Sequence, residues 1–286
     1  STSSVAAAAE PLRIVAATND LGAIARAVGG EAVEIEVVAR PDRDPHVLEV
    51  RPSTMRMAAR ADLYLEVGLS LDLWSPEIVR GSRNRDLRVL DCSEPIEPLE
   101  VPTGKVDASQ GDVHPEGNPH YWLDPMNGAA VARYLAEAFA RADPDRAADY
   151  RANADRFVAG IEQRVPRWKE RLQGASFIEY HRTWVYFADR FGVEIVDRVE
   201  PLPGIPPSAR HLASLSETIR ATGVPVVVRD PYHPDDAVEF LERQTGVETA
   251  VLPSTCAEPR PESYLALFEA AVDLLGREAA RPADGR

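Results

Sequence analysis

Short apolar stretches alternate with helix-like stretches along the first 92 residues of the chain. In residues 31–39, apolar and polar side chains alternate with a period of two, which is typical of a β-strand with one buried face. Residues 13–18 form a short apolar run, and Asn19-Asp20 can cap the helix that we expect to follow it. Further strands are predicted at 63–68 and 87–92, and helices at 19–28, 53–60 and 71–80. Strands that alternate with helices predict βα units and a mostly parallel sheet.

A second kind of pattern follows a long loop at residues 93–119. Asp124-Pro125 opens a predicted helix that extends to 142, and Asp143-Pro144 opens another. The apolar positions of the second helix recur every three or four residues and form one stripe: Tyr150, Ala154, Phe157, Ile161, Val165, Trp168 and Leu172. A helix of about 28 residues is about 40 Å long, and Pro166 should kink it near its end. We expect this helix to be a rigid spine that joins two lobes.

The alternation of strands and helices restarts after the spine. Strands are predicted at 176–180, 193–198, 224–230 and 249–253, and helices at 181–191, 208–221, 235–244 and 261–275. The predicted fold class is therefore α/β, with two lobes that are each a four-stranded, mostly parallel sheet flanked by helices and that are joined by one long spine helix. The expected divisions are an N-terminal lobe at 11–142, the spine helix at 143–174 and a C-terminal lobe at 175–286.

Composition narrows the range of functions. The 286 residues include 32 basic and 46 acidic side chains, a formal charge of −14, and nucleic acid is not expected as a partner because its binding depends on basic clusters. No uncharged apolar stretch approaches the ~18 residues that span a bilayer, so no membrane insertion is expected. The two cysteines, Cys92 and Cys256, allow either two free buried thiols or one long-range disulfide.

Three of the six histidines occupy positions where ligands bind in α/β proteins. His46, His120 and His181 each lie between a predicted strand and the following helix, beyond the carboxyl end of the strand. His233 is a secondary candidate at another strand end, whereas His211 lies inside a helix and is expected to face solvent. Three imidazoles with one oxygen ligand suit a divalent transition metal such as zinc, although separations of 74 and 61 residues match no compact zinc-binding motif.

Four sequence segments resemble the cluster A-I substrate-binding proteins of metal ABC transporters. The first segment contains Asp44-Pro45-His46, followed by Pro52-Ser53-Thr54-Met55. The second, Asn118-Pro119-His120-Tyr121-Trp122-Leu123-Asp124-Pro125, is similar to the second-ligand motif of that family. The third is His181 with the aromatic segment after it, and the fourth is the turn Gly204-Ile205-Pro206-Pro207-Ser208. The resemblance extends in order from about residue 11 to 276 and includes the arrangement of lobe, spine and lobe.

The resemblance implies a high-affinity receptor that captures a divalent metal between its lobes and delivers it to an ABC permease. His46, His120 and His181 carry over as metal ligands. Zn²⁺ is favoured over Mn²⁺ because manganese receptors of this family tend to have a carboxylate where this chain has His181. A periplasmic monomer is expected, with a metallochaperone as a further candidate partner. The small residues Val5 to Ala9 resemble the remnant of a cleaved signal peptide, and expression scars look similar.

The fourth ligand is less certain, since the family's usual aspartate is replaced in the segment Leu252-Pro253-Ser254-Thr255-Cys256. Asp230, at the end of the preceding strand, is the predicted substitute, either as a metal ligand or as a residue that orients a ligand histidine. It could instead cap the following helix. Glu258, Cys256 and water are the other candidates for the fourth position.

The loop at 101–119 contains His114 together with Asp107, Asp112 and Glu116. It fits either a weak metal-collecting loop, as in zinc-specific relatives, or an ordinary solvated acidic loop.

A zinc hydrolase with three histidines and a metal-bound water is the rival prediction. Neither an HExxH motif nor a GxSxG motif occurs, and Glu179 and Asp230 are the only plausible general bases. The chain is therefore predicted not to be an enzyme. A second rival is an adhesin or scaffold that keeps the fold but binds no metal tightly.

Overall fold

A computed structural model describes residues 10–104, 111 and 114–280 of the chain. Val5 to Ala9, Asp107 and Asp112 lie outside the described residues. The N-terminal lobe contains these elements in chain order: β1 Leu12–Ala16, α1 Asn19–Gly29, η1 Gly30–Ala32, β2 Val33–Val37, α2 Pro52–Ala58, β3 Leu63–Glu66, α3 Ser75–Ser82, β4 Arg88–Asp91, η3 Tyr121–Leu123 and α4 Pro125–Ala142. The chain then enters η4 Pro144–Arg146 and the long helix α5 Ala147–Arg171.

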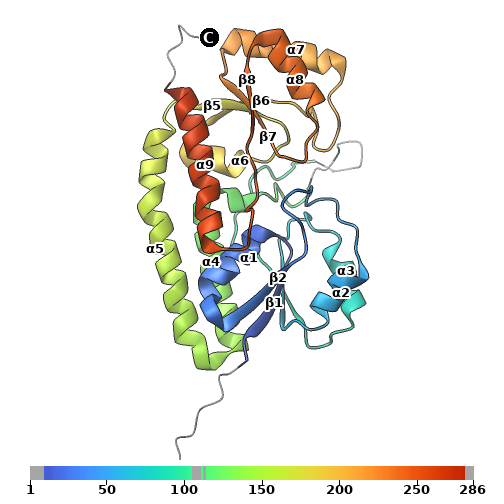
Figure 1. Ribbon diagram of the computed structural model, residues 1–286, viewed down its shortest axis with the longest axis vertical. Helices are drawn as coiled ribbons and strands as arrows, with labels where there is room; N and C mark the ends of the chain where they lie inside the picture. The colour runs from blue at the N-terminus through green and yellow to red at the C-terminus, as the bar shows by residue number, and fades with distance from the viewer. Residues whose placement is uncertain (1–9, 105–110, 112–113, 281–286) are drawn as a thin grey trace, which may run out of the picture.

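The four strands of the N-terminal lobe form one sheet in the order β2-β1-β3-β4, and each pairing is parallel. Helices α1, α4 and α5 contact one another on one side of this sheet. The pair α2 and α3 lies on the side away from α5 (Figure 1). Both faces are covered, which explains why the central strands β1 and β3 are almost wholly apolar and buried.

The C-terminal lobe repeats this arrangement with a second sheet. Its elements are β5 Ser176–Glu179, α6 Val185–Phe191, β6 Glu194–Arg198, α7 Ala209–Thr222, β7 Val226–Arg229, α8 Asp236–Thr245, β8 Glu248–Val251 and α9 Pro261–Ala279. The strand order is β6-β5-β7-β8, again with parallel pairings. The predicted fold class is therefore confirmed, and in the described residues both sheets are entirely parallel.

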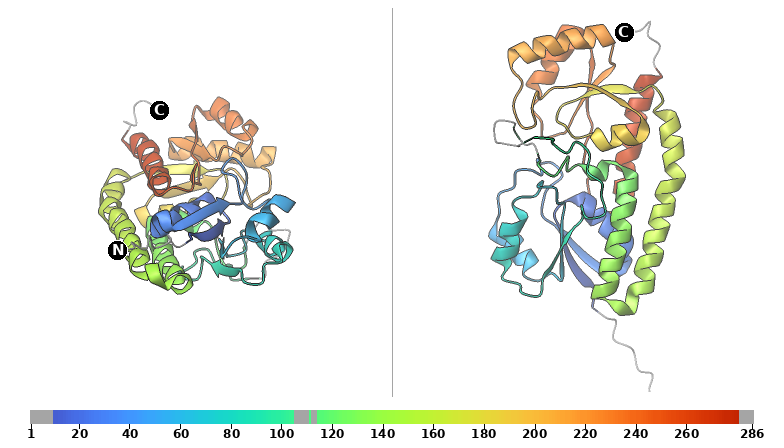
Figure 2. Two further views of the ribbon diagram at one scale, coloured as in Figure 1. Left: turned by 60° about the horizontal axis from the view of Figure 1, so that its bottom comes forward. Right: turned by 180° about the vertical axis from the view of Figure 1, so that it is seen from behind.

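Two long helices connect the lobes. Helix α5 runs beside α4 along the length of the molecule, and α9 lies next to it (Figures 1 and 2). Helix α9 contacts α1 of the N-terminal lobe as well as α5 and β5, so the predicted C-terminal lobe at 175–286 includes a helix that packs on both lobes. The divisions at 11–142, 143–174 and 175–286 stay a prediction.

One hydrophobic core runs through both lobes. Side chains of a strand alternate between the two faces of its sheet, so Phe177 joins the large core shared with the N-terminal lobe. Its neighbour Ile178 belongs to a smaller core beneath α7 and α8. Trp168 of α5 stacks on Phe268 of α9, with ring centroids 5.5 Å apart, inside the shared core. This continuous packing fixes the lobes relative to each other.

Local details differ little from the prediction. Helix α6 begins at Val185 rather than at 181, because the buried Glu179 side chain accepts hydrogen bonds from the backbone N–H groups of Thr183 and Trp184 and holds 181–184 in a turn. Helix α9 extends to Ala279, four residues beyond the expected end at 275. Both cysteines are free and buried. Among the described residues, no helix combines the length and apolar character that a membrane crossing requires.

Candidate metal centre

The three histidines singled out by their positions in the sequence meet between the lobes. His46, His120 and His181 form a group in which one ring nitrogen from each lies within 4.8 Å of the others. The ring centroids are 5.2 Å apart for His46 and His120, 5.3 Å for His46 and His181, and 5.5 Å for His120 and His181. Imidazoles around one tetrahedral zinc, with Zn–N distances of about 2 Å, place their centroids about 5 Å apart. The group therefore has the spacing of a shared ion.

Each of the three histidines lies in a connection between a strand and the next helix. His46 lies between β2 and α2, in a loop anchored by the Trp74 indole, whose Nε1 donates to the carbonyl of Pro45. His120 directly precedes η3 and α4, while His181 follows β5 by two residues. Because these connections leave the carboxyl ends of parallel strands, the two sheets direct their ligand-bearing loops toward one cleft.

The imidazoles are oriented by oxygen acceptors on the ring side away from the group. His46 Nδ1 is 2.8 Å from Asp44 Oδ1, His120 Nδ1 is 3.0 Å from Asn118 Oδ1, and His181 Nδ1 is 2.8 Å from Glu200 Oε2. An oxygen that accepts from Nδ1–H fixes the tautomer and leaves the Nε2 lone pair available. His46 Nε2 is buried and has no hydrogen-bond partner, as expected for a donor atom awaiting a cation.

Burial and neighbouring charges shift the pKa values of His120 and His181 in opposite directions. Burial lowers the pKa of His120 well below its usual value, with further lowering by the neighbouring histidines. Burial also lowers the pKa of His181, but its hydrogen bond to Glu200 and the carboxylate charge outweigh this and raise the pKa overall. Although burial opposes it, contact with His46 lowers the pKa of Asp44 to about 2. Asp44 therefore stays ionised near neutral pH and favours a positive charge in the cleft.

Asn118 connects two of the ligand-bearing loops. Its Oδ1 accepts from both the backbone N–H and Nδ1 of His120. Its Nδ2 donates to the carbonyl of Arg182, next to His181, and to Glu100 Oε2. The Tyr186 hydroxyl donates to the Asn118 carbonyl. The position of His120 is thus tied to the backbone beside His181.

Asp230 does not belong to this group of histidines. Its side chain is buried, and Oδ1 accepts from the backbone N–H of Ser254 at 2.7 Å and from its Oγ at 2.8 Å. Ser254 in turn accepts from Trp122 Nε1 through its carbonyl, and the Trp122 ring lies 5.3 Å from that of His120. Burial raises the pKa of Asp230 to about 6.

The other proposed sources of a fourth ligand are engaged elsewhere. Cys256 is buried against Asp20 at the start of α1, and its backbone N–H donates to Asp20 Oδ1 at 2.9 Å. Glu258 forms a surface ion pair with Arg260. In the part of the chain that the structure describes, the three histidines are the one group whose donor atoms come together in this way.

The remaining histidines lie at increasing distance from the group. The His114 ring stacks on His46 at 5.3 Å, with its Nε2 buried. His233 stacks on Tyr180 at 4.3 Å and is 6.2 Å from His181. His211 is half-buried rather than solvent-facing as predicted, because its Nε2 contacts the carbonyl of Arg198 at 3.0 Å.

Sequence reasoning missed Glu200 and the orienting role of Asn118. Asn118 was in view only as part of the Asn-Pro-His motif, and that motif was the available signal for it. Glu200 lies in no histidine motif. The register of β5 with β6 brings it beside His181, and a single sequence contains no local sign of that pairing.

The two general bases that a hydrolase would need are unavailable. Glu179 is fully buried, with Oε1 2.6 Å from Arg198 Nε and Oε2 bonded to backbone N–H groups. Asp230 is held by Ser254. His114, His120 and His181 line a cavity of about 30 Å³.

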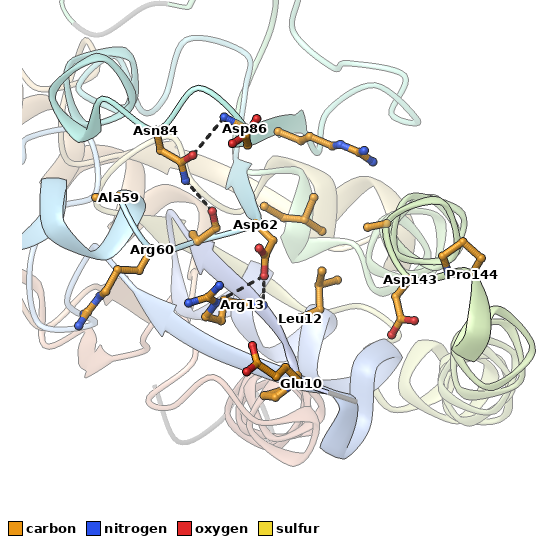
Figure 3. A pocket seen from close by; sticks show the side chains of 15 residues that line it. Glu10, Leu12, Arg13, Ala59, Arg60, Asp62, Asn84, Asp86, Asp143 and Pro144 are labelled. Carbon is orange, nitrogen blue, oxygen red and sulfur yellow. Dashed lines mark hydrogen bonds and ion pairs between the residues drawn. The ribbon is translucent and has the colours of Figure 1, made fainter. Parts of the chain in front are cut away.

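A larger pocket of about 720 Å³ lies at the opposite, amino-terminal edge of the N-terminal sheet (Figure 3). Two of its polar contacts join residues of the lining: Arg13 pairs with Asp62, and Asn84 donates to the carbonyl of Ala61. It contains no histidine. The candidate metal-binding side chains therefore lie between the lobes and not in this pocket.

Comparison with known proteins agrees with this geometry. Residues 14–277 match the protein family described as zinc-uptake complex component A, periplasmic (ZnuA). The chain belongs to this family. It is accordingly a metal-binding receptor of an ABC transporter, with a membrane permease as its partner, and not an enzyme, so the hydrolase alternative is wrong.

Individual relatives support the same fold. The high-affinity zinc uptake system protein ZnuA of Paracoccus denitrificans is 27% identical over 257 residues, which cover 78% of this chain and 77% of that protein. A crystal structure of ZnuA superposes with a TM-score of 0.83 at 22% identity, covering 95% of this chain and 100% of that chain. FpvC of Pseudomonas aeruginosa, solved with Ni²⁺, has a TM-score of 0.79 at 21% identity over 94% of this chain and 97% of its own; its Mn²⁺ complex is equally similar.

Proposed function

We propose that this receptor captures Zn²⁺ with high affinity between its lobes in the periplasm and delivers it to the permease for uptake. The observation that carries the proposal is the convergence of His46, His120 and His181, each with an oxygen acceptor at Nδ1. Such acceptors raise the basicity of the ligand nitrogen and hold the ring in place before the ion arrives. The zinc is cargo, so the site must bind it tightly and still release it.

The donor set supports zinc over manganese. Three imidazole nitrogens and no carboxylate make up the group, and imidazole suits zinc, whereas carboxylate and water suit manganese. The Paracoccus relative is named for zinc uptake, while FpvC was solved with nickel and with manganese. We therefore propose Zn²⁺ as the preferred cargo and expect Mn²⁺ to bind more weakly.

Asp230 is proposed to act as a positioning residue. Its bonds to Ser254, and the bond from Trp122 to Ser254, connect it to the ring that packs beside His120. We expect Asp230→Ala to weaken Zn²⁺ binding by about 10-fold, the lower end of what loss of an outer partner costs. Asp230→Asn should recover most of this loss, because an amide oxygen can still accept from Ser254. If Asp230 were instead a metal ligand, Asp230→Asn would not recover the affinity that Asp230→Ala loses.

The continuous core supports a small conformational change on release. Since α5 and α9 both pack on the two lobes, we propose that loops, rather than a wide hinge rotation, open the site when the receptor docks on the permease. Crystals of metal-free and zinc-loaded protein would test this, and a large rotation of one lobe against the other would contradict it. We further propose that the receptor acts as a monomer and accepts zinc either directly or from a metallochaperone; light scattering after size exclusion tests the first point.

The central experiment measures the bound metal. Purified protein is analysed for metal content and then titrated with Zn²⁺ and Mn²⁺ in competition with a chelating dye, beside the variant His181→Ala. We expect one Zn²⁺ per chain, preference for Zn²⁺ over Mn²⁺, and loss of tight binding in the variant. Preference for Mn²⁺ would assign the receptor to manganese, and the absence of tight binding of either ion would reject metal capture and favour an adhesin or scaffold.

A further inference from the structure

His114 has the properties of a metal ligand that has not yet engaged. Its Nε2 is buried and has no hydrogen-bond partner, which is uncommon for a polar atom inside a protein. The ring is held on its other side by a hydrogen bond to the backbone of Ser70. A solvated acidic loop would not bury an imidazole in this way.

The location of His114 points to the same ion as the other three. Its ring centroid is 5.3 Å from that of His46, the same separation that His46 has from His181. His114 also lines the cavity of about 30 Å³ that His120 and His181 line. Two independent observations therefore direct it to the metal centre: an unpartnered buried nitrogen and a cavity that it shares with His120 and His181.

The chemistry of the centre calls for one more donor. Zinc sites closed by protein ligands are almost always tetrahedral, and three histidines supply three of four positions. Asp230, Cys256 and Glu258 are occupied by Ser254, Asp20 and Arg260 respectively. His114 is not among the histidines whose nitrogens lie within 4.8 Å of one another, so its ring has to shift inward to reach the ion.

Resting on the proposed zinc function, we propose that His114 Nε2 is the fourth ligand in the loaded receptor. The centre is then four imidazoles, two contributed by loops that precede α2 and η3, one by the segment after β5, and one by His114. A neutral four-imidazole shell leaves the ion its full charge, balanced at longer range by Asp44 and Glu200.

The test counts imidazoles in the zinc-loaded protein. Full-length protein is loaded with one equivalent of Zn²⁺, and X-ray absorption fine structure is recorded for wild type, His114→Ala and the matched control His211→Ala. We expect four imidazoles in wild type and in the control, and three in His114→Ala. In dye competition, the Kd of His114→Ala should rise by at least about 100-fold, beyond what an outer partner costs, while the control stays within twofold of wild type.

The outcomes separate this inference from the proposed function. If wild type binds Zn²⁺ tightly with three imidazoles and an oxygen donor, the receptor function stands and the role of His114 is overturned. A Kd for His114→Ala close to that of wild type overturns it as well. If wild type binds no Zn²⁺, the proposed function itself fails. The count in wild type does not depend on any variant folding, and circular dichroism checks that the variants keep the wild-type structure.

Discussion

The carboxylate of Glu200 should contribute to zinc affinity although it does not touch the ion. It is 12% exposed and accepts from His181 Nδ1 at 2.8 Å and from the backbone N–H of Gly204 at 2.9 Å. The substitution Glu200→Gln keeps an oxygen that can accept from Nδ1–H, so the ring stays in place. What it removes is the negative charge behind the ligand.

The size of the effect follows from the geometry. The path from Glu200 Oε2 through the ring to a bound ion adds the 2.8 Å hydrogen bond, about 2 Å across the imidazole and about 2 Å of Zn–N bond, or about 7 Å. One negative charge at that distance from a divalent ion contributes about 1 kcal/mol in water and about 5 kcal/mol at an effective dielectric constant of 20. Loss of an outer partner usually costs 10–100-fold in affinity, about 1.4–2.7 kcal/mol, which lies within this range.

The assay is a dye-competition titration of Zn²⁺ at pH 7.5 on wild type, Glu200→Gln and Glu258→Gln. The control removes one carboxylate from a surface ion pair with Arg260, in the same half of the molecule and away from the histidines. We expect the Kd to rise 10–100-fold for Glu200→Gln and to stay within twofold for Glu258→Gln. Equal affinities for Glu200→Gln and wild type, with unchanged thermal melting, would falsify the reasoning that outer carboxylates tune this site.

Three further changes test other parts of the structure. Asn118→Ala removes the acceptor of His120 Nδ1 and should weaken Zn²⁺ binding about 10–100-fold in a competition titration. The control Asn153→Ala on α5 should leave the affinity unchanged. Equal losses of affinity in both variants would count against a specific role of Asn118. Trp168→Ala opens the core between α5 and α9 and should lower the free energy of unfolding by about 3–5 kcal/mol in urea, with a loss below 1 kcal/mol contradicting the packing argument. Burial and the charges of nearby acids raise the pKa of Glu66 to about 7 from its ordinary 4.5, so wild type loses stability as the pH rises through that window. The free energy of unfolding of Glu66→Gln, relative to wild type, should therefore be higher at pH 8 than at pH 5. Urea titrations that give the same difference between the two proteins at both pH values would reject this.

Hydrophobic patterning was sufficient to predict the fold because both sheets are built from local units. The alternation in residues 31–39 and the apolar runs before each helix correspond to strands β1 to β8 within a few residues. Each βα unit is specified by residues near in sequence, and parallel order follows from the connection through a helix. Where the boundaries differ, as at α6, a tertiary contact of Glu179 is the cause.

The apolar stripe on α5 predicted that one face of the helix is buried, but not which elements pack against that face. Tyr150, Ala154, Phe157 and Trp168 predicted one buried face, and each is buried. Periodicity does not reveal the partner of that face, however. The structure shows α1, α4 and α9 as the neighbouring helices of α5 and extends the contact to both lobes, which makes the connection wider than a single spine.

The positions of the three histidines in loops could be predicted from the sequence, but their meeting at one point could not. Residues beside the histidines were enough to predict loops between a strand and a helix, because turn and capping residues act locally. Whether three rings from residues 46, 120 and 181 meet within 4.8 Å depends on how two sheets face each other, and packing of the shared core decides that. The same packing buried His114 beside His46, bonded Asp230 to Ser254 and brought Glu200 behind His181. A chain by itself encodes its local elements and the identity of its donor atoms, while distances between donors far apart in sequence arise only when the folded core fixes them.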